Sequence, residues 1–293
     1  MSDRQPRLSH LAERLAALEQ LDPVAEPLAK KVRDLIPGGP VKDALSGTWL
    51  GHALHPLLQL LPLGTWTSAV ILDLIGGEDG QASADKLIGT GLLATVPTVV
   101  TGWSDYADTT VASDSVRRIG ILHAASNVTG ATLFAGSLLA RGKGRRGRGK
   151  LLAMAGMGAV GAGGWLGGHL AYAEGVGVDN TAFEQYPQDW TRVADDADVR
   201  EGEPRRVEVG GIPLLMVRDG GEVRVLADRC THRGGPLSDG KISDGCVTCP
   251  WHGSVFRLSD GSVERGPAAY PQPALDVRVR DGGVEVRNRP VAA

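Results

Sequence analysis

Two short stretches, Cys230-Thr231-His232 and Cys249-Pro250-Trp251-His252-Gly253, decide how the C-terminal part of this 293-residue chain folds. Each stretch contributes one thiol and one imidazole, and a Gly-rich hairpin sequence separates the two. Thiolates and imidazole nitrogens are metal ligands, so the pattern predicts one metal centre built by two facing loops. A structural zinc site also takes two Cys and two His, but Cys246 would then be a fifth candidate ligand. Four ordinary core residues are the other alternative.

This part of the chain, from about Asp189 to Asn288, resembles the Rieske family. In that family a Cys-x-His loop faces a Cys-x-x-His loop, and together they hold a [2Fe–2S] cluster with Cys on one iron and His on the other. Gly234-Gly235-Pro236-Leu237 and Gly253-Ser254 stand where the family shapes its two loops. The ligands that the resemblance implies are Cys230, His232, Cys249 and His252. Cys246 is then expected to be a buried structural thiol.

The residues around the loops resemble a ferredoxin-type member of the family. Quinol-oxidising members carry an extra Cys in each loop and a Tyr aimed at a Cys ligand, and here those places hold Gly235, Trp251 and Phe256. Ser254 remains as the residue whose hydroxyl would bond a bridging sulfide and tune the cluster. Fewer donors near the sulfurs predict a low or intermediate potential. Rieske oxygenases would also need a mononuclear iron domain after the cluster, and the chain ends at Ala293.

Alternating apolar and polar residues around the two loops predict an all-β domain, an antiparallel sandwich. Gly- and Asp-rich turns such as 259–261 and 281–283 predict hairpins between the strands. The segment from Gly266 to Pro273 resembles the loop that covers the cluster in the family, and a plain connector is the alternative. The strands are expected at 205–209, 214–218, 222–226, 255–258, 276–279 and 284–286.

The preceding part of the chain predicts a four-helix transmembrane bundle. Two segments, 119–140 and 151–172, each run 22 residues without Lys, Arg, Asp or Glu, which is long enough to cross a hydrocarbon core. Two weaker candidates, 57–75 and 87–103, precede them. Gly51-His52-Ala53-Leu54-His55-Pro56 matches the Gly-His-x-x-His-Pro motif of an uncharacterised bacterial four-helix membrane family, which this region resembles.

The expected fold class is therefore α plus β in two domains, the helical bundle first and the β domain second. An amphipathic N-terminal segment is expected because Leu alternates with charge at helical spacing. The domain boundaries predicted are 1–43 for this segment, 44–178 for the bundle, 179–188 for a linker and 189–289 for the Rieske domain.

The segment between the last two predicted spans, 141–150, holds six cations and no anion. The positive-inside rule places it in the cytoplasm, so the Rieske domain is expected on the extracytoplasmic side of a bacterial cell membrane. Export of a folded domain needs a signal, and Arg145-Arg146 resembles a twin-arginine signal before the last span. A generic basic loop is the alternative reading.

Four histidines lie near the ends of the predicted spans on one membrane face: His52, His55, His123 and His169. Ionisable groups at membrane depth are candidates for function, here a haem, metal or quinone site. Histidines that bond carbonyls or lipid headgroups are the alternative. The chain has no Cys-x-x-Cys-His attachment motif, so any haem would be a noncovalent haem b.

Three functions are compatible with these patterns, and an electron-transfer protein or oxidoreductase subunit is expected rather than a complete enzyme. The first is a membrane-anchored carrier of single electrons to or from a partner protein. The second is a quinol- or haem-linked membrane subunit that uses the histidine layer, and the third is an iron-sulfur redox sensor. The partners expected are the lipid bilayer and a redox protein (a reductase, an oxygenase or a respiratory component), and no nucleic acid.

Overall fold

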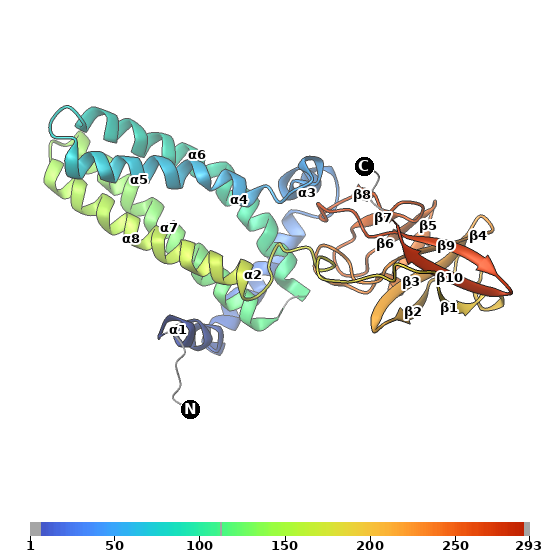
Figure 1. The fold of residues 1–293 in the computed structure, drawn as a ribbon. Helices are drawn as coiled ribbons and strands as arrows, with labels where there is room; N and C mark the ends of the chain where they lie inside the picture. Colours follow the sequence, from blue (N-terminus) through green and yellow to red (C-terminus); the bar gives the residue numbers. More distant parts are fainter. Residues whose placement is uncertain (1–6, 112, 290–293) are drawn as a thin grey trace. The chain divides into compact units, whose positions relative to one another are not determined.

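The structure, a computed structural model, describes residues 7–111 and 113–289 and divides into two compact units (Figure 1). The helical unit comprises the chain up to Ile36 together with Leu54–Val176. The β unit comprises Pro37–Ala53 together with the chain from Gly177 onward. The predicted boundaries place residues 37–53 with the N-terminal segment and the bundle, whereas their contacts lie with the β unit.

The helical unit contains two amphipathic helices followed by four longer ones. The elements are α1 (Arg7–Ala16), η1 (Glu19–Leu21), α2 (Asp22–Leu35), α4 (His55–Leu58), α5 (Leu60–Ile75), α6 (Gln81–Ala107), η3 (Asp108–Val111), α7 (Asp114–Gly142) and α8 (Arg146–Tyr172). Helix α2 buries Ala25, Ala29 and Val32 at helical spacing, which is the amphipathic pattern that the sequence predicts.

By length and composition, three of the described helices could cross a membrane: His55–Ile75, Gln81–Ala107 and Arg146–Tyr172. Helix α7 contains the segment 119–140 and has 29 residues, but it is not among the three. Its Ser, Asn, Thr and Gly residues lower its mean hydropathy even though the segment carries no charge. A fourth span in α7 therefore stays a prediction.

Small residues let α7 and α8 approach closely, as is common between helices in membranes. A Cβ placed on Gly156 of α8 would lie 3.1 Å from Cδ2 of Phe134 and 3.2 Å from the carbonyl of Gly130, both on α7. Phe134 in turn stacks on Trp66 of α5, with ring centroids 4.4 Å apart. The bundle core thus depends on large rings that pack against glycine.

Charged side chains join the helices at the end of the bundle where α7 and α8 connect. The guanidinium of Arg141 donates to both oxygens of Asp73 and, at 3.0 Å, to Asp85. Arg146 donates to Asp85 at 2.5 Å, and Lys150 donates to the carbonyl of Asp73 at 2.6 Å. The side chains of Asp73 and Arg141 are only 2% and 1% exposed, so this pair is fully desolvated.

The β unit contains three antiparallel sheets, and strands form at all six of the positions predicted. The sheets have the orders β1-β10-β9, β2-β3-β4 and β5-β6-β7-β8. The strands are β1 (Thr191–Asp195), β2 (Arg205–Val209), β3 (Ile212–Asp219), β4 (Glu222–Ala227), β5 (Lys241–Ser243), β6 (Cys246–Thr248), β7 (Val255–Arg257), β8 (Val263–Arg265), β9 (Leu275–Arg280) and β10 (Gly283–Asn288). The short helices are α3 (Pro40–Ser46), η2 (Thr48–Leu50), η4 (Asp196–Asp198) and η5 (Leu237–Asp239).

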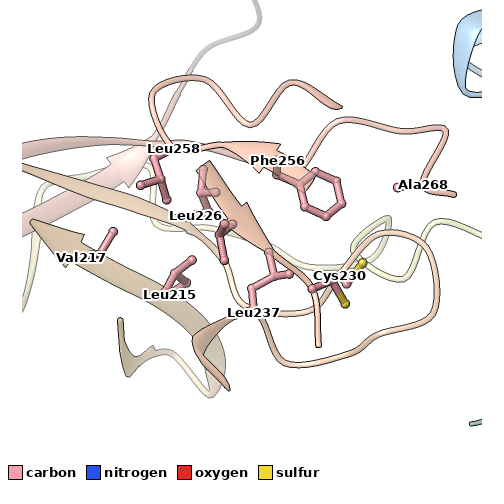
Figure 2. Close-up of a cluster of buried hydrophobic side chains, with 10 residues drawn as sticks. Leu215, Val217, Leu226, Cys230, Leu237, Phe256, Leu258 and Ala268 are labelled. Carbon is pink, nitrogen blue, oxygen red and sulfur yellow. The ribbon is translucent and has the colours of Figure 1, made fainter. Parts of the chain in front are cut away.

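One of the two apolar cores of this unit reaches the predicted metal-binding loops (Figure 2). Cys230 and Cys249 are buried in this core together with Leu237 and Phe256. Cys246 is half-buried, whereas the sequence predicts a buried thiol. Side chains alternate along β6, and Val247 is the residue of this strand that points into the core.

Candidate functional site

The two loops have the same backbone hydrogen-bond pattern. In the first, Cys230 N–H donates to the carbonyl of Gly235 at 2.9 Å, and Gly234 N–H donates to the carbonyl of Cys230 at 2.8 Å. In the second, Cys249 N–H donates to Ser254 O at 2.8 Å, and Gly253 N–H donates to Cys249 O at 3.0 Å. Each cysteine therefore opens a tight loop of equal size.

Glycine is required where each loop closes. Gly234 and Gly253 both have a φ of +75°, in the left-handed region that L side chains rarely adopt. These are the two loop glycines that follow His232 and His252 in the sequence, and their conformation turns each loop back toward its own cysteine.

The structure brings the four predicted ligands together as two like pairs. A side-chain hydrogen bond joins the thiols of Cys230 and Cys249. The rings of His232 and His252 lie edge to face with centroids 4.9 Å apart. Both imidazoles are half-buried, whereas both thiols are buried. The sulfurs thus occupy the inner end of the site and the imidazoles occupy its outer end.

The two thiols shift each other's pKa in opposite directions. Their mutual hydrogen bond lowers the pKa of Cys249 to about 7 and raises the pKa of Cys230 well above its usual value. Backbone N–H groups of Trp251 and His252 also lower the pKa of Cys249. The N–H groups that stabilise a thiolate here are placed to stabilise negative charge on a metal-bound sulfur as well.

The segment 266–273 joins the two loops. Ala268 N–H donates to Ser254 Oγ at 3.0 Å, and the Thr231 hydroxyl donates to the carbonyl of Tyr270 at 2.9 Å. The buried amide of Gln272 accepts from Thr231 N–H at 3.1 Å and donates to the carbonyl of Arg229 at 2.6 Å. This segment holds the site together, which favours the covering loop over the plain connector.

The chain matches two family models in separate regions. Residues 189–279 match the Rieske [2Fe-2S] domain, and residues 51–180 match a predicted membrane protein family, DUF2231. Ferredoxin CarAc from Metapseudomonas resinovorans is 34% identical over 100 residues, which cover 34% of this chain and 94% of that protein. The chain belongs to the Rieske [2Fe–2S] family.

Other relatives match the same Rieske domain. The anthranilate 1,2-dioxygenase ferredoxin subunit from Burkholderia cepacia is 32% identical over 98 residues, which cover 33% of this chain and 91% of that subunit. Apoptosis-inducing factor 3 from Mus musculus is 38% identical over 90 residues, 31% of this chain. The chain spans only 15% of the length of that larger protein. The similarity to all three therefore concerns one domain.

The residues present fit a Rieske cluster in two respects. The donor set is divided into a thiol pair and an imidazole pair, as a cluster with two different irons requires. Beside the thiols, Gly235 keeps space open, since a Cβ there would lie 3.0 Å from Cys249 Sγ and 2.9 Å from the Trp251 ring.

Gly235→Ala is expected to reduce cluster occupancy. The added methyl group would push against Cys249 Sγ and Trp251, and overpacking of this kind costs about 1–3 kcal/mol. Iron and acid-labile sulfide per chain measure the effect. Gly38→Ala, at an exposed glycine of the same unit with no atom within 4 Å of the added carbon, is the matched control. Equal iron content in both variants would refute the expectation.

Two segments contact the Rieske loops and their covering segment, although no sequence motif predicts these contacts. The amide of Asn180, in the predicted linker, donates to the carbonyls of Thr231 and His232 at 3.2 Å each. From the segment 37–53, the hydroxyl of Thr48 donates to the carbonyl of Ala268 at 3.1 Å. Both contacts join residues far apart in the chain, so local periodicity could not have predicted them.

Thr48→Val is expected to speed the loss of the cluster. The hydroxyl of Thr48 fixes Ala268, whose N–H in turn holds Ser254 beside the second loop. Loss of one hydrogen bond should raise the rate of cluster release to a chelator about fivefold, if release needs local opening of this segment. Thr48→Ser should restore the rate, and Thr191→Val, on distant β1, should leave it unchanged. An unchanged rate in Thr48→Val would show that the contact is dispensable.

The structure shows a contact for each of the four predicted membrane histidines. His55 and His123 face each other in the helical unit, with ring centroids 6.4 Å apart. Nε2 of His169 lies 3.8 Å from Oε1 of Glu174. His52 belongs to the β unit, where its ring contacts Tyr270. The ring pair of His55 and His123 therefore joins two of the four histidines within the helical unit.

Proposed function

We propose that this protein is a membrane-anchored Rieske electron carrier that passes single electrons to or from a partner protein. The observation that carries the proposal is the pairing of the site residues, thiol with thiol and imidazole with imidazole. A bound [2Fe–2S] cluster takes up and gives up one electron. The proposed cluster ligands are Cys230, His232, Cys249 and His252.

The surrounding residues favour a carrier over a quinol oxidase. Backbone N–H groups point at both sulfurs, and Ser254 is the proposed side-chain donor to a bridging sulfide. Because Ser254 Oγ already accepts from Ala268 N–H, its own proton is left to donate elsewhere. The half-buried rings of His232 and His252 give electrons a short route to a docked protein. The relatives that the domain covers almost entirely are named as ferredoxins, which supports this role.

A test of the carrier function uses a flavin-dependent ferredoxin reductase from an aromatic-ring dioxygenase system, with NADH as the electron source. The detergent-purified full-length protein is mixed with both under anaerobic conditions, and bleaching of the cluster is followed. Reduction should depend on the reductase and slow as salt is added, if charged side chains guide docking. A cluster that dithionite reduces but the reductase does not would contradict a ferredoxin-like role.

We further propose that α5, α6, α7 and α8 span the bilayer, with the segment 141–150 in the cytoplasm and the Rieske domain outside. Three of these helices are apolar and long enough, and α7 matches their length. Arg145-Arg146 stays a candidate export signal, although Arg146 also has a structural partner in Asp85. Protease added to spheroplasts should remove the Rieske domain, and protease added to inverted vesicles should spare it. The opposite pattern would reverse the proposed orientation.

A second candidate function is a haem- or quinol-linked role for the helical unit. One observation favours it, the approach of the His55 and His123 rings to 6.4 Å inside a unit that matches a membrane protein family. In this function the helical unit itself takes part in electron transfer, in addition to anchoring the Rieske domain in the membrane. It predicts a redox-active absorption band that survives when the Rieske cluster is removed.

A further inference from the structure

We propose that His55 and His123 bind the iron of one b-type haem from opposite sides. This inference rests on the second candidate function and names its ligand and the two axial residues. The two imidazoles come from different helices, His55 from the start of α4 and His123 from α7. Their planes are nearly perpendicular, at 79°.

The separation of the rings matches two axial bonds to one metal atom. An iron midway between the two centroids would be 3.2 Å from each. A metal–imidazole bond of about 2.0 Å plus about 1.2 Å from the nitrogen to the ring centroid gives the same value. Edge-to-face ring pairs also occur at about 4.5–7 Å, so the spacing leaves room for one iron atom, and the hydrogen bonds of the two rings carry the argument further.

The hydrogen bonds of each ring leave Nε2 as the nitrogen that can bind a metal. Nδ1 of His55 lies 2.9 Å from the carbonyl of Thr98, and Nδ1 of His123 lies 2.7 Å from the carbonyl of Gly163. A carbonyl can only accept, so Nδ1 carries the proton and Nε2 keeps its lone pair. Metal-binding histidines use this arrangement to fix the tautomer and the orientation of the ring.

Close packing on glycine holds each ring in place. A Cβ on Gly102 of α6 would lie 2.8 Å from Cε1 of His55, and a Cβ on Gly167 of α8 would lie 3.0 Å from Cε1 of His123. Asn127 lies 3.3 Å from Nε2 of His123, but its amide also donates to the backbone carbonyl of His123 at 3.0 Å. The amide keeps that carbonyl as its partner when a metal takes the nitrogen.

The number of protein ligands selects a haem over a bare ion. Two imidazoles leave a transition metal short of ligands, and no third His, Cys, Asp or Glu within residues 7–111 and 113–289 joins them in a metal site. A porphyrin supplies four more nitrogens and completes six-coordinate iron. The three cysteines of the chain, Cys230, Cys246 and Cys249, all lie in the Rieske domain, so the haem would be noncovalent. With both axial positions filled, the iron serves electron transfer and not oxygen binding.

The experiment measures haem in the detergent-purified full-length protein after incubation with hemin, by pyridine haemochrome assay and by the optical spectrum before and after dithionite. The wild-type protein should hold one haem per chain with a six-coordinate, low-spin spectrum. His55→Gln and His123→Gln should each lose the low-spin spectrum and most of the haem. His169→Gln and His52→Gln are the matched controls. Both should keep the haem and the low-spin spectrum, because His169 contacts Glu174 and His52 contacts Tyr270.

Chemical rescue separates ligation from folding. In His123→Gly, added imidazole should restore the low-spin spectrum, since the free ligand can enter the space left by the ring. Wild-type protein that binds no hemin, or His55→Gln and His123→Gln variants that bind as much haem as the wild type with the same low-spin spectrum, would overturn the haem site. The Rieske signal of the same samples reports separately on the proposed carrier, so the loss of one centre does not imply the loss of the other.

Discussion

Cys249→Ser is expected to abolish the Rieske cluster, whereas Cys246→Ser should leave it intact. Cys249 is buried in the loop core and is hydrogen-bonded to Cys230, so the two thiols stand side by side where one iron would be held. Cys246 is half-buried on β6, turned away from that core. A serine hydroxyl is a poor substitute for thiolate in holding iron and sulfide. The two variants make the same chemical change in one domain, so each controls for the other.

The readout is iron and acid-labile sulfide per chain together with the EPR signal of the reduced protein. Cys249→Ser should retain less than a tenth of the wild-type signal, because even the loss of a hydrogen-bond partner of a ligand costs about 10–100-fold in metal affinity. His232→Cys and His252→Cys should convert or destroy the spectrum, because the second iron then loses its imidazole pair. Loss of the cluster in Cys246→Ser with retention in Cys249→Ser would overturn the ligand assignment.

Asp73→Asn should destabilise the helical unit more than any other single polar change at that end of the bundle. The substitution keeps the shape of the side chain but leaves the guanidinium of Arg141 buried without its main counter-charge. Removal of one partner from a buried pair costs about 3–5 kcal/mol, and Asp85, which still contacts Arg141 at 3.0 Å, should keep the loss near the lower end. Thermal unfolding in detergent measures the effect.

Two further variants test the cause of that loss. Asp79→Asn removes an exposed carboxylate from the connection between α5 and α6 and should have little effect. Asp73→Leu combined with Arg141→Met should recover part of the stability, because apolar replacement of both partners removes the desolvation cost. If Asp73→Asn unfolds at the wild-type temperature, the buried pair does not stabilise the bundle.

Local patterns predicted strands in the β unit from the alternation of apolar and polar residues in its sequence. Val223 and Val225 of β4 are buried in one apolar core, and Leu226 between Val225 and Ala227 is buried in the other, so both faces of this strand end are covered. The sequence also predicted the metal-binding loops, since Cys-x-His and Cys-x-x-His fix both residue type and spacing. The short strands β5, β6 and β8 have three residues each, too few for the pattern to show.

Contacts between distant parts of the chain could not be predicted in this way. Thr48 stands beside the helical segments in the sequence, yet its hydroxyl bonds Ala268, 220 residues later. Asn180 lies in an apparent linker and bonds the first Rieske loop. Of the predicted histidine layer, the structure shows the ring pair of His55 and His123, and the layer as a whole stays a prediction.

The central claim is that this protein holds a Rieske cluster in the Cys230 and Cys249 loops. The measurement that tests it most directly is the EPR and optical spectrum of the dithionite-reduced, detergent-purified full-length protein, with iron, sulfide and zinc determined on the same sample. A Rieske signal with two irons and two sulfides per chain is the predicted result. One zinc per chain, without iron and without an EPR signal, would contradict it.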